Sequence, residues 1–112
     1  MNALDEVFAR TRAEDRAALI AYLPAGYPDL ETSIASVRAL AEEGVDIVEV
    51  GVPYSDPVMD GPVVEQAAAA ALQAGFRLSH VFDIVRAVRE AGAVPVVMSY
   101  WNPVLRYGPD RF

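Results

Sequence analysis

Asp46-Ile-Val-Glu-Val-Gly-Val-Pro-Tyr-Ser-Asp-Pro-Val-Met-Asp-Gly-Pro62 is the stretch around which the rest of the chain is organised. It begins as the Val/Ile run typical of a strand buried in a parallel sheet, and it continues into a stiff loop rich in proline, glycine and acid. Glu49 interrupts the apolar run between Val48 and Val50. Because a lone buried charge is costly, a carboxylate here has to be paired, protonated or functional. Glu49 is therefore the predicted chemical centre.

Composition narrows the classes of protein that this chain can belong to. Its 112 residues are 54% hydrophobic and 22% charged, which predicts a single domain over residues 1–112. A net charge of -7 argues against nucleic acid and anionic membranes as partners. With no cysteine and one histidine, we expect neither disulfides nor a metal site. Frequent charges near the start and the lack of a membrane-length apolar run predict a cytoplasmic protein.

Segments with helical periodicity alternate with short apolar runs along the chain. Asp29 and Ser79 are expected to cap helices, and Tyr100 is expected to open a loop that leads to a further helix only after residues 108–110. The predicted helices, with their caps and terminal glycines, are 2–13, 29–44, 62–75 and 79–92. The predicted strands are 17–23, 45–50 and 94–99.

The interval between the second and third predicted strands is about 20 residues longer than the interval between the first and second. The excess lies in residues 51–75, directly after the second strand. Parallel α/β folds handle ligands in the loops that follow the carboxyl ends of their strands. The long loop and Glu49 therefore point to the same place.

Two carboxylates are the candidates for chemistry at this place. Alternation puts Ile47, Glu49 and Gly51 on one face of the strand, while Asp60 lies further on in the loop. Two carboxylates in unlike environments can divide the work, one moving a proton and the other offsetting a positive charge. The alternative is that Glu49 forms a structural ion pair and Asp60 caps the next helix. The spacing of the residues alone favours neither interpretation over the other.

Aromatic residues follow the strands at the same end. Tyr22 ends the first strand, Tyr54 lies in the long loop, and Tyr100 and Trp101 end the third strand. They could form an apolar slot for a flat ring, although packing at the rim of the fold is the commoner role of such residues. His80 is expected to be a solvated residue at a helix start. No glycine-rich phosphate loop is present.

The segment from Glu49 to Pro62 closely resembles the motif Glu-[Leu/Ile/Val]-Gly-[Val/Ile]-Pro-[Phe/Tyr]-Ser-Asp-Pro-x-Ala-Asp-Gly-Pro of the tryptophan synthase alpha chain family. Residues 22–29 and 98–108 resemble the ends of that family's first and third strands. The resemblance implies an α/β fold, a (β/α)8 TIM barrel, of which this chain holds the N-terminal part, a helix followed by three parallel strands and their helices. It also implies a lyase that cleaves indole-3-glycerol phosphate to indole and glyceraldehyde 3-phosphate.

The resemblance also assigns roles to residues. Glu49 matches the acid-base residue, and Asp60 matches the carboxylate that binds the indole N–H. It implies no cofactor in this chain, and a pyridoxal-phosphate beta chain as partner in an alpha2beta2 tetramer. Residues matching the lining of the indole pocket are Tyr22, Val64, Met98 and Tyr100. Residues matching the loops that meet the beta chain are Pro53, Asp56 and Asn102. Two departures from the usual motif are Met59 and the pair Glu65-Gln66.

Length is the main departure from the family. Such a barrel needs about 250 residues and eight strands, whereas three strands are predicted here. In the family, groups after the seventh and eighth strands hold the phosphate. We therefore expect a fragment that is inactive by itself. The alternatives are a docking module that only binds the beta chain, or a piece of another phosphate-handling TIM-barrel lyase or isomerase.

Overall fold

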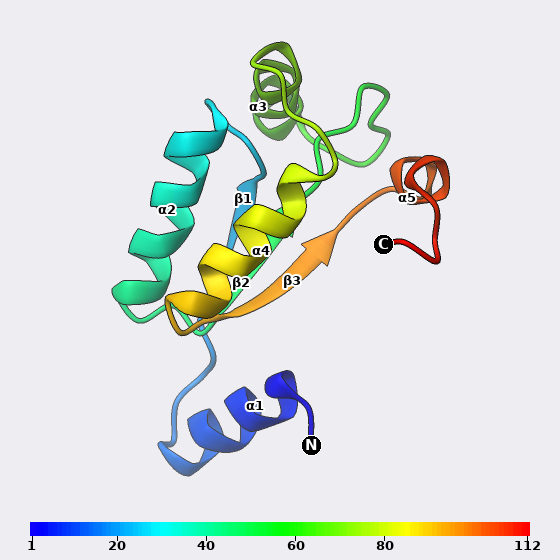
Figure 1. Ribbon diagram of the computed structural model, residues 1–112. Coiled ribbons are helices and arrows are strands. Elements are labelled where there is room, and N and C mark those ends of the chain that lie inside the picture. Colours follow the sequence, from blue (N-terminus) through cyan, green and yellow to red (C-terminus); the bar gives the residue numbers. More distant parts are fainter.

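The computed structural model describes residues 1–112, which form a three-stranded parallel sheet with five helices (Figure 1). The strands lie in the order β1-β2-β3, as a right-handed strand-helix-strand path places them. The strands are β1 (Ile20–Pro24), β2 (Ile47–Gly51) and β3 (Val94–Met98). The helices are α1 (Ala3–Ala13), α2 (Leu30–Glu42), α3 (Pro62–Gln73), α4 (His80–Glu90) and α5 (Trp101–Tyr107).

One face of the sheet is covered by α2 and α4, which lie against each other in front of the strands in Figure 1. Val48 and Val50 of β2 point into this layer and are 0% and 1% exposed, as predicted from strand alternation. Ile84 of α4 and Val37 of α2 meet them from the helical side. The hydrophobic core therefore lies between the sheet and these two helices.

Helices α2 and α4 do not cover the other face of the sheet. Strand register places Tyr22, Glu49 and Val96 in one row on this face. Pro24, Gly51 and Met98 form the next row, at the carboxyl ends of the strands. Ile20 is 52% exposed on the same face. The uncovered face thus carries Glu49, and it leads up to the loops after the strands.

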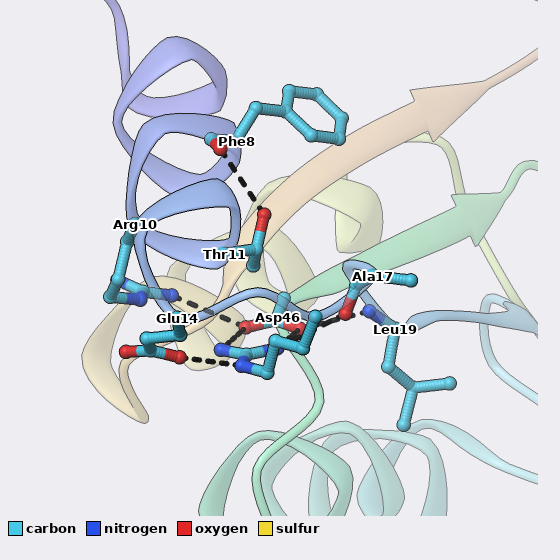
Figure 2. A network of polar contacts seen from close by, with 8 residues as sticks. Phe8, Arg10, Thr11, Glu14, Ala17, Leu19 and Asp46 are labelled. Atoms are coloured by element: carbon cyan, nitrogen blue, oxygen red, sulfur yellow. Dashed lines mark hydrogen bonds and ion pairs between the residues drawn. The ribbon is translucent and has the colours of Figure 1, made fainter.

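Helix α1 lies beyond the amino ends of the strands and is fastened there by Asp46 (Figure 1, Figure 2). The Asp46 side chain, 4% exposed, accepts hydrogen bonds from Arg10 Nη2 at 3.2 Å and from Arg16 Nη1 at 2.9 Å. Its Oδ2 atom also accepts the backbone N–H of Leu19 at 2.9 Å. The Arg16 guanidinium and the Leu19 N–H hold the pKa of Asp46 well below its usual range. The prediction that residues 2–13 cover one end of the fold is confirmed.

The first strand begins at Ile20, later than the predicted Ala17. Residues 17–19 are apolar, but Asp46 and Arg16 bind this segment through side chains. Leu19 donates its N–H to Asp46, and Arg16 Nη1 donates to the Ala17 carbonyl at 3.2 Å. The apolar run therefore includes a connection held by side chains as well as a strand.

Two predictions about helix starts are wrong. The expected loop from Tyr100 is the helix α5, because Pro103 lies in the first turn, where a helix needs no N–H from that residue. Ser79 occupies the N-cap position of α4, but its side chain makes no capping hydrogen bond, because its backbone is already helical (φ -58°, ψ -24°). Instead, His80 Nδ1 accepts the N–H of Arg77 at 3.0 Å. Asp29 does cap α2, by accepting the N–H of Thr32 at 2.8 Å.

Candidate functional site

Glu49 lies in the middle of β2 and points to the uncovered face of the sheet, between Tyr22 of β1 and Val96 of β3. Its side chain is partly exposed and takes part in no ion pair or hydrogen bond. The predicted alternative of a structural ion pair therefore finds no cation in these 112 residues. Glu49 is free to meet a ligand on this face.

The ring of Tyr22 lies directly over Gly51. A β-carbon at position 51 would come within 2.2 Å of the Tyr22 hydroxyl oxygen and 2.6 Å of the ring carbon that carries it. The absence of a side chain at Gly51 therefore lets the phenol reach across to the carboxyl end of β2. The Tyr22 hydroxyl, which belongs to β1, therefore lies over Gly51 at the end of β2.

Beyond partial burial, the charges of both predicted catalytic carboxylates raise the pKa of the Tyr22 phenol. Partial burial raises the pKa of Tyr22, and the charges of Asp60 and Glu49 raise it further, with a smaller contribution from Tyr100. Asp60 comes from the loop after β2 and Glu49 from the strand itself. Both charges therefore lie near enough to the Tyr22 hydroxyl to affect its pKa.

Asp60 is not a helix cap, which was the alternative left open by spacing. The N-cap of α3 is Gly61, Pro62 is in the first turn, and no side chain caps the helix. Asp60 therefore remains available to a ligand. The start of α3 also carries Val64, which is half-buried, and α3 packs against β1. Met98 pairs with Gly51 in the row above Glu49.

Tyr100 connects the end of β3 to the loop that carries Asp60. Its hydroxyl oxygen accepts the backbone N–H of Met59 at 2.9 Å and of Val58 at 3.2 Å. The ring of Tyr54 lies 5.2 Å from the ring of Tyr100. Tyr54 in turn accepts a hydrogen bond from Asn102 Nδ2 at 2.8 Å. Tyr100 thus ties the loop that carries Asp60 to the segment after β3.

An open groove of about 860 Å³ lies between this loop and α5. Pro53, Asp56 and Asn102, the three residues predicted to face a partner, all line it. Pro53 is buried, so Asp56 and Asn102 supply the exposed part. Arg106, also in the lining, was missed because it lies on α5, a helix that the sequence did not predict.

The chain shows no group of three His, Cys, Asp or Glu side chains placed to hold a metal ion. Every helix is too short or too polar to cross a bilayer. The polar groups gathered at the carboxyl end of the sheet are carboxylates and phenols. Such groups can transfer protons and hold a ring nitrogen.

Comparison with known proteins identifies the fold and the family. The family described as Tryptophan synthase alpha chain matches residues 8–112. Alpha chains from Nocardia farcinica and Mycobacteroides abscessus are 64% and 61% identical over 109 residues. These matches cover 97% of this chain and 41% and 42% of the relatives. The chain thus spans about two fifths of the length of the curated relatives that it matches.

Solved structures agree with the sequence comparison. Tryptophan synthase from M. tuberculosis in its aminoacrylate-bound form matches all of this chain and 46% of its own, at 55% identity and a TM-score of 0.96. Tryptophan synthase subunit alpha from Legionella pneumophila matches 99% of this chain and 43% of its own, at 32% identity and a TM-score of 0.92. The predicted fold class is confirmed, with the three strands and their helices forming part of a (β/α)8 barrel. The chain belongs to the tryptophan synthase alpha chain family.

Proposed function

We propose that this chain carries the acid-base half of a lyase site that cleaves indole-3-glycerol phosphate to indole and glyceraldehyde 3-phosphate. The observation that carries the proposal is that Glu49, unpaired, lies beside Tyr22 on the uncovered face of the sheet, just before the loop that carries Asp60. Family membership supplies the substrate, since the geometry alone supports only proton transfer beside a flat apolar ligand.

The reaction needs one proton moved between two atoms of the substrate. Glu49 donates a proton to the ring carbon that bears the side chain, which leaves positive charge on the indole ring. Asp60 accepts the ring N–H and offsets that charge. Glu49 then takes the proton from the side-chain hydroxyl, the carbon-carbon bond breaks, and its electrons return to the ring. The products are indole and an aldehyde, and no cofactor is required in this chain.

The roles of the other residues follow from their places. Tyr22 and Met98 stand on the rows beside and above Glu49, where a ring bound at Glu49 would rest. Val64 begins the helix after Asp60, and Tyr100 closes the opposite side. We assign these four residues to the indole pocket. Their mixture of aromatic and aliphatic side chains suits a flat ring.

The groove lined by Pro53, Asp56 and Asn102 supports a partner as the second half of the proposal. We propose that a tryptophan synthase beta chain, which carries pyridoxal phosphate, docks there and receives the indole, in an alpha2beta2 assembly. The proposal places both chains in the cytoplasm. A chain that only docked would leave Glu49 and Asp60 without a task.

A chimera tests the catalytic assignment. Residues 1–112 would replace the equivalent part of the Nocardia farcinica alpha chain, and indole release from indole-3-glycerol phosphate would be measured. We expect Glu49→Gln to lower kcat by about 10²–10⁴-fold, the usual share of a general acid-base group. We expect Asp60→Asn to lower it by about 10²–10³-fold.

Glu42→Gln is the matched control for the chimera. Glu42 is exposed at the end of α2, away from the sheet's carboxyl edge, so the rate should not change. Equal rates for Glu49→Gln and the unmodified chimera would refute the assignment.

A further inference from the structure

The loop that carries Asp60 has almost no backbone support of its own. Residues 53–60, the Asp60 loop, make no hydrogen bond between backbone groups. The last such bond before the loop joins Val52 N–H to the Met98 carbonyl at 2.9 Å, and the next joins Glu65 N–H to the Gly61 carbonyl. Something other than backbone pairing must therefore hold this loop in place.

Apolar packing does not hold the tip of the Asp60 loop either. Val58 and Met59 are 85% and 83% exposed, so their side chains bury almost no surface. Within the loop, Ser55 Oγ donates to Asp56 Oδ2 at 3.0 Å, a bond between neighbours that does not tie the loop to the sheet. The tip depends on contacts from outside the loop.

Tyr100 supplies that contact. Its hydroxyl oxygen accepts two consecutive backbone N–H groups, from Val58 at 3.2 Å and Met59 at 2.9 Å. Tyr100 lies two residues after the end of β3 and is the N-cap residue of α5, so its backbone is held between the sheet and this helix. The Tyr54 ring, 5.2 Å from that of Tyr100, limits the freedom of the phenol from the other side.

We propose that Tyr100 is a positioning residue, whose hydroxyl holds the Asp60 loop so that the Asp60 carboxylate faces the site. Asp60 is the next residue after Met59, so fixing the Met59 N–H fixes the backbone from which the carboxylate projects. A phenylalanine could line an indole pocket equally well, but it could not accept these two N–H groups. The inference rests on the proposed function only for the role of Asp60 in the reaction. The attachment of the loop to the Tyr100 hydroxyl does not depend on that function.

Amide hydrogen exchange of the whole 112-residue chain tests the attachment. In the unmodified chain, the amides of Val58 and Met59 should be protected relative to those of Ser55 and Asp56, which have no hydrogen-bond acceptor. Equal protection factors at the four amides would overturn the proposal without any variant.

Tyr100→Phe should then lower protection at Val58 and Met59 by roughly five- to tenfold, the usual effect of one net hydrogen bond, and leave β2 unchanged. Tyr107→Phe is the matched control, because the Tyr107 ring packs on Phe82 and its hydroxyl forms no hydrogen bond. Unchanged protection in Tyr100→Phe would overturn the proposal.

A double-mutant cycle in the chimera tests whether Tyr100 acts through Asp60. Tyr100→Phe should lower kcat/KM by about tenfold when Asp60 is present and have no further effect after Asp60→Asn. Additive losses would show that Tyr100 acts independently of Asp60 and would refute the positioning role. A chimera that releases no indole while Val58 and Met59 stay protected would contradict the proposed function and support the attachment.

Discussion

Position 51 has to be glycine because the phenol of Tyr22, on the neighbouring strand, occupies the space that a side chain would need. Two ring carbons and the hydroxyl oxygen of Tyr22 would all lie within 2.7 Å of an added β-carbon. Neither the backbone of β2 nor the sheet register can shift easily, since β2 pairs on both sides. A larger residue at 51 must therefore displace Tyr22.

Gly51→Ala should lower the free energy of unfolding by about 1–3 kcal/mol, the usual cost of overpacking a close contact. Urea unfolding of the 112-residue chain measures the change. The control is the same substitution in a Tyr22→Ala background, where the ring is absent and the loss should largely vanish. A full loss in both backgrounds would show that the Tyr22 ring is not the cause.

At the scale of residues, the sequence indicated which groups are unusual but not which of them touch. Glu49 was predicted because a carboxylate is rare in a buried Val/Ile strand. The approach of Tyr22 to Gly51 and the bonds from Val58 and Met59 to Tyr100 were not predicted. They arise between segments far apart in sequence, where no local pattern records them.

At the scale of elements, the polar attachment of helix α1 converges on one carboxylate, beside the buried side chains of Val7 and Thr11. Asp46 is buried, and both arginines that pair with it, Arg10 and Arg16, precede β1 (Figure 2). A buried carboxylate with several charged donors is stabilised as an anion, so its pKa falls in the folded chain. Its contribution to stability is present above about pH 4 and is lost as the pH falls through the lowered pKa.

Asp46→Asn should lower the free energy of unfolding by about 2 kcal/mol near pH 7, because it removes charge-assisted hydrogen bonds from a buried site. Toward pH 3 the difference from the unmodified chain should shrink. Protonation of Asp46 in the unfolded state lowers the stability of the unmodified chain there, whereas the variant has no carboxylate at this position. Urea unfolding at the two pH values measures both effects. Asp83→Asn, at an exposed pair with Arg86, should change little. A difference independent of pH would contradict the role of the charge.

Elements with long apolar faces were predicted well, and their ends less well. Helices α2, α3 and α4 were expected from their periodicity and their glycine ends, and the structure confirms them. Helix α5 was not predicted, because a loop was expected from Tyr100, although Pro103 fits the first turn of a helix. Ser79 stands at the N-cap of α4 without a capping hydrogen bond, because its backbone is already helical, and only the folded backbone shows this.

At the scale of the whole molecule, the sheet divides two tasks between its faces. One face packs on α2 and α4 and holds the core, while the other carries Glu49 and remains uncovered. The proposed partner groove is lined by residues of α5 and of the loop after β2. Both segments lie at the carboxyl end of the sheet (Figure 1). Within the same strands, the side chains on one face thus stabilise the fold and those on the other face are the candidates for chemistry.

Calorimetric titration of this chain against the beta chain tests the docking proposal. We expect measurable heat, and we expect Asp56→Lys to weaken binding by about tenfold or more, since it reverses a charge on the exposed part of the groove. Glu42→Lys makes the same change of charge at the far end of α2 and should bind normally. Equal binding by the two variants, or no heat from a folded sample, would contradict the groove as the docking surface.

The barrel itself could not be worked out from three strands by spacing. The alternation of strands and helices predicted a parallel α/β sheet, which is compatible with both open and closed folds. Only the long motif from Glu49 to Pro62 pointed to a (β/α)8 barrel, and the comparisons confirm it. The assignment of Pro53, Asp56 and Asn102 to a partner interface came from the same resemblance, not from the pattern of apolar residues, and the structure places the three in one groove.

The contact between Tyr22 and Gly51 has a consequence for the evolution of the motif. The glycine lies inside the Glu49–Pro62 signature, yet its neighbour in space belongs to another strand. Selection on an aromatic ring at position 22 therefore also maintains the glycine at position 51. We therefore expect glycine at position 51 wherever an aromatic ring stands at position 22.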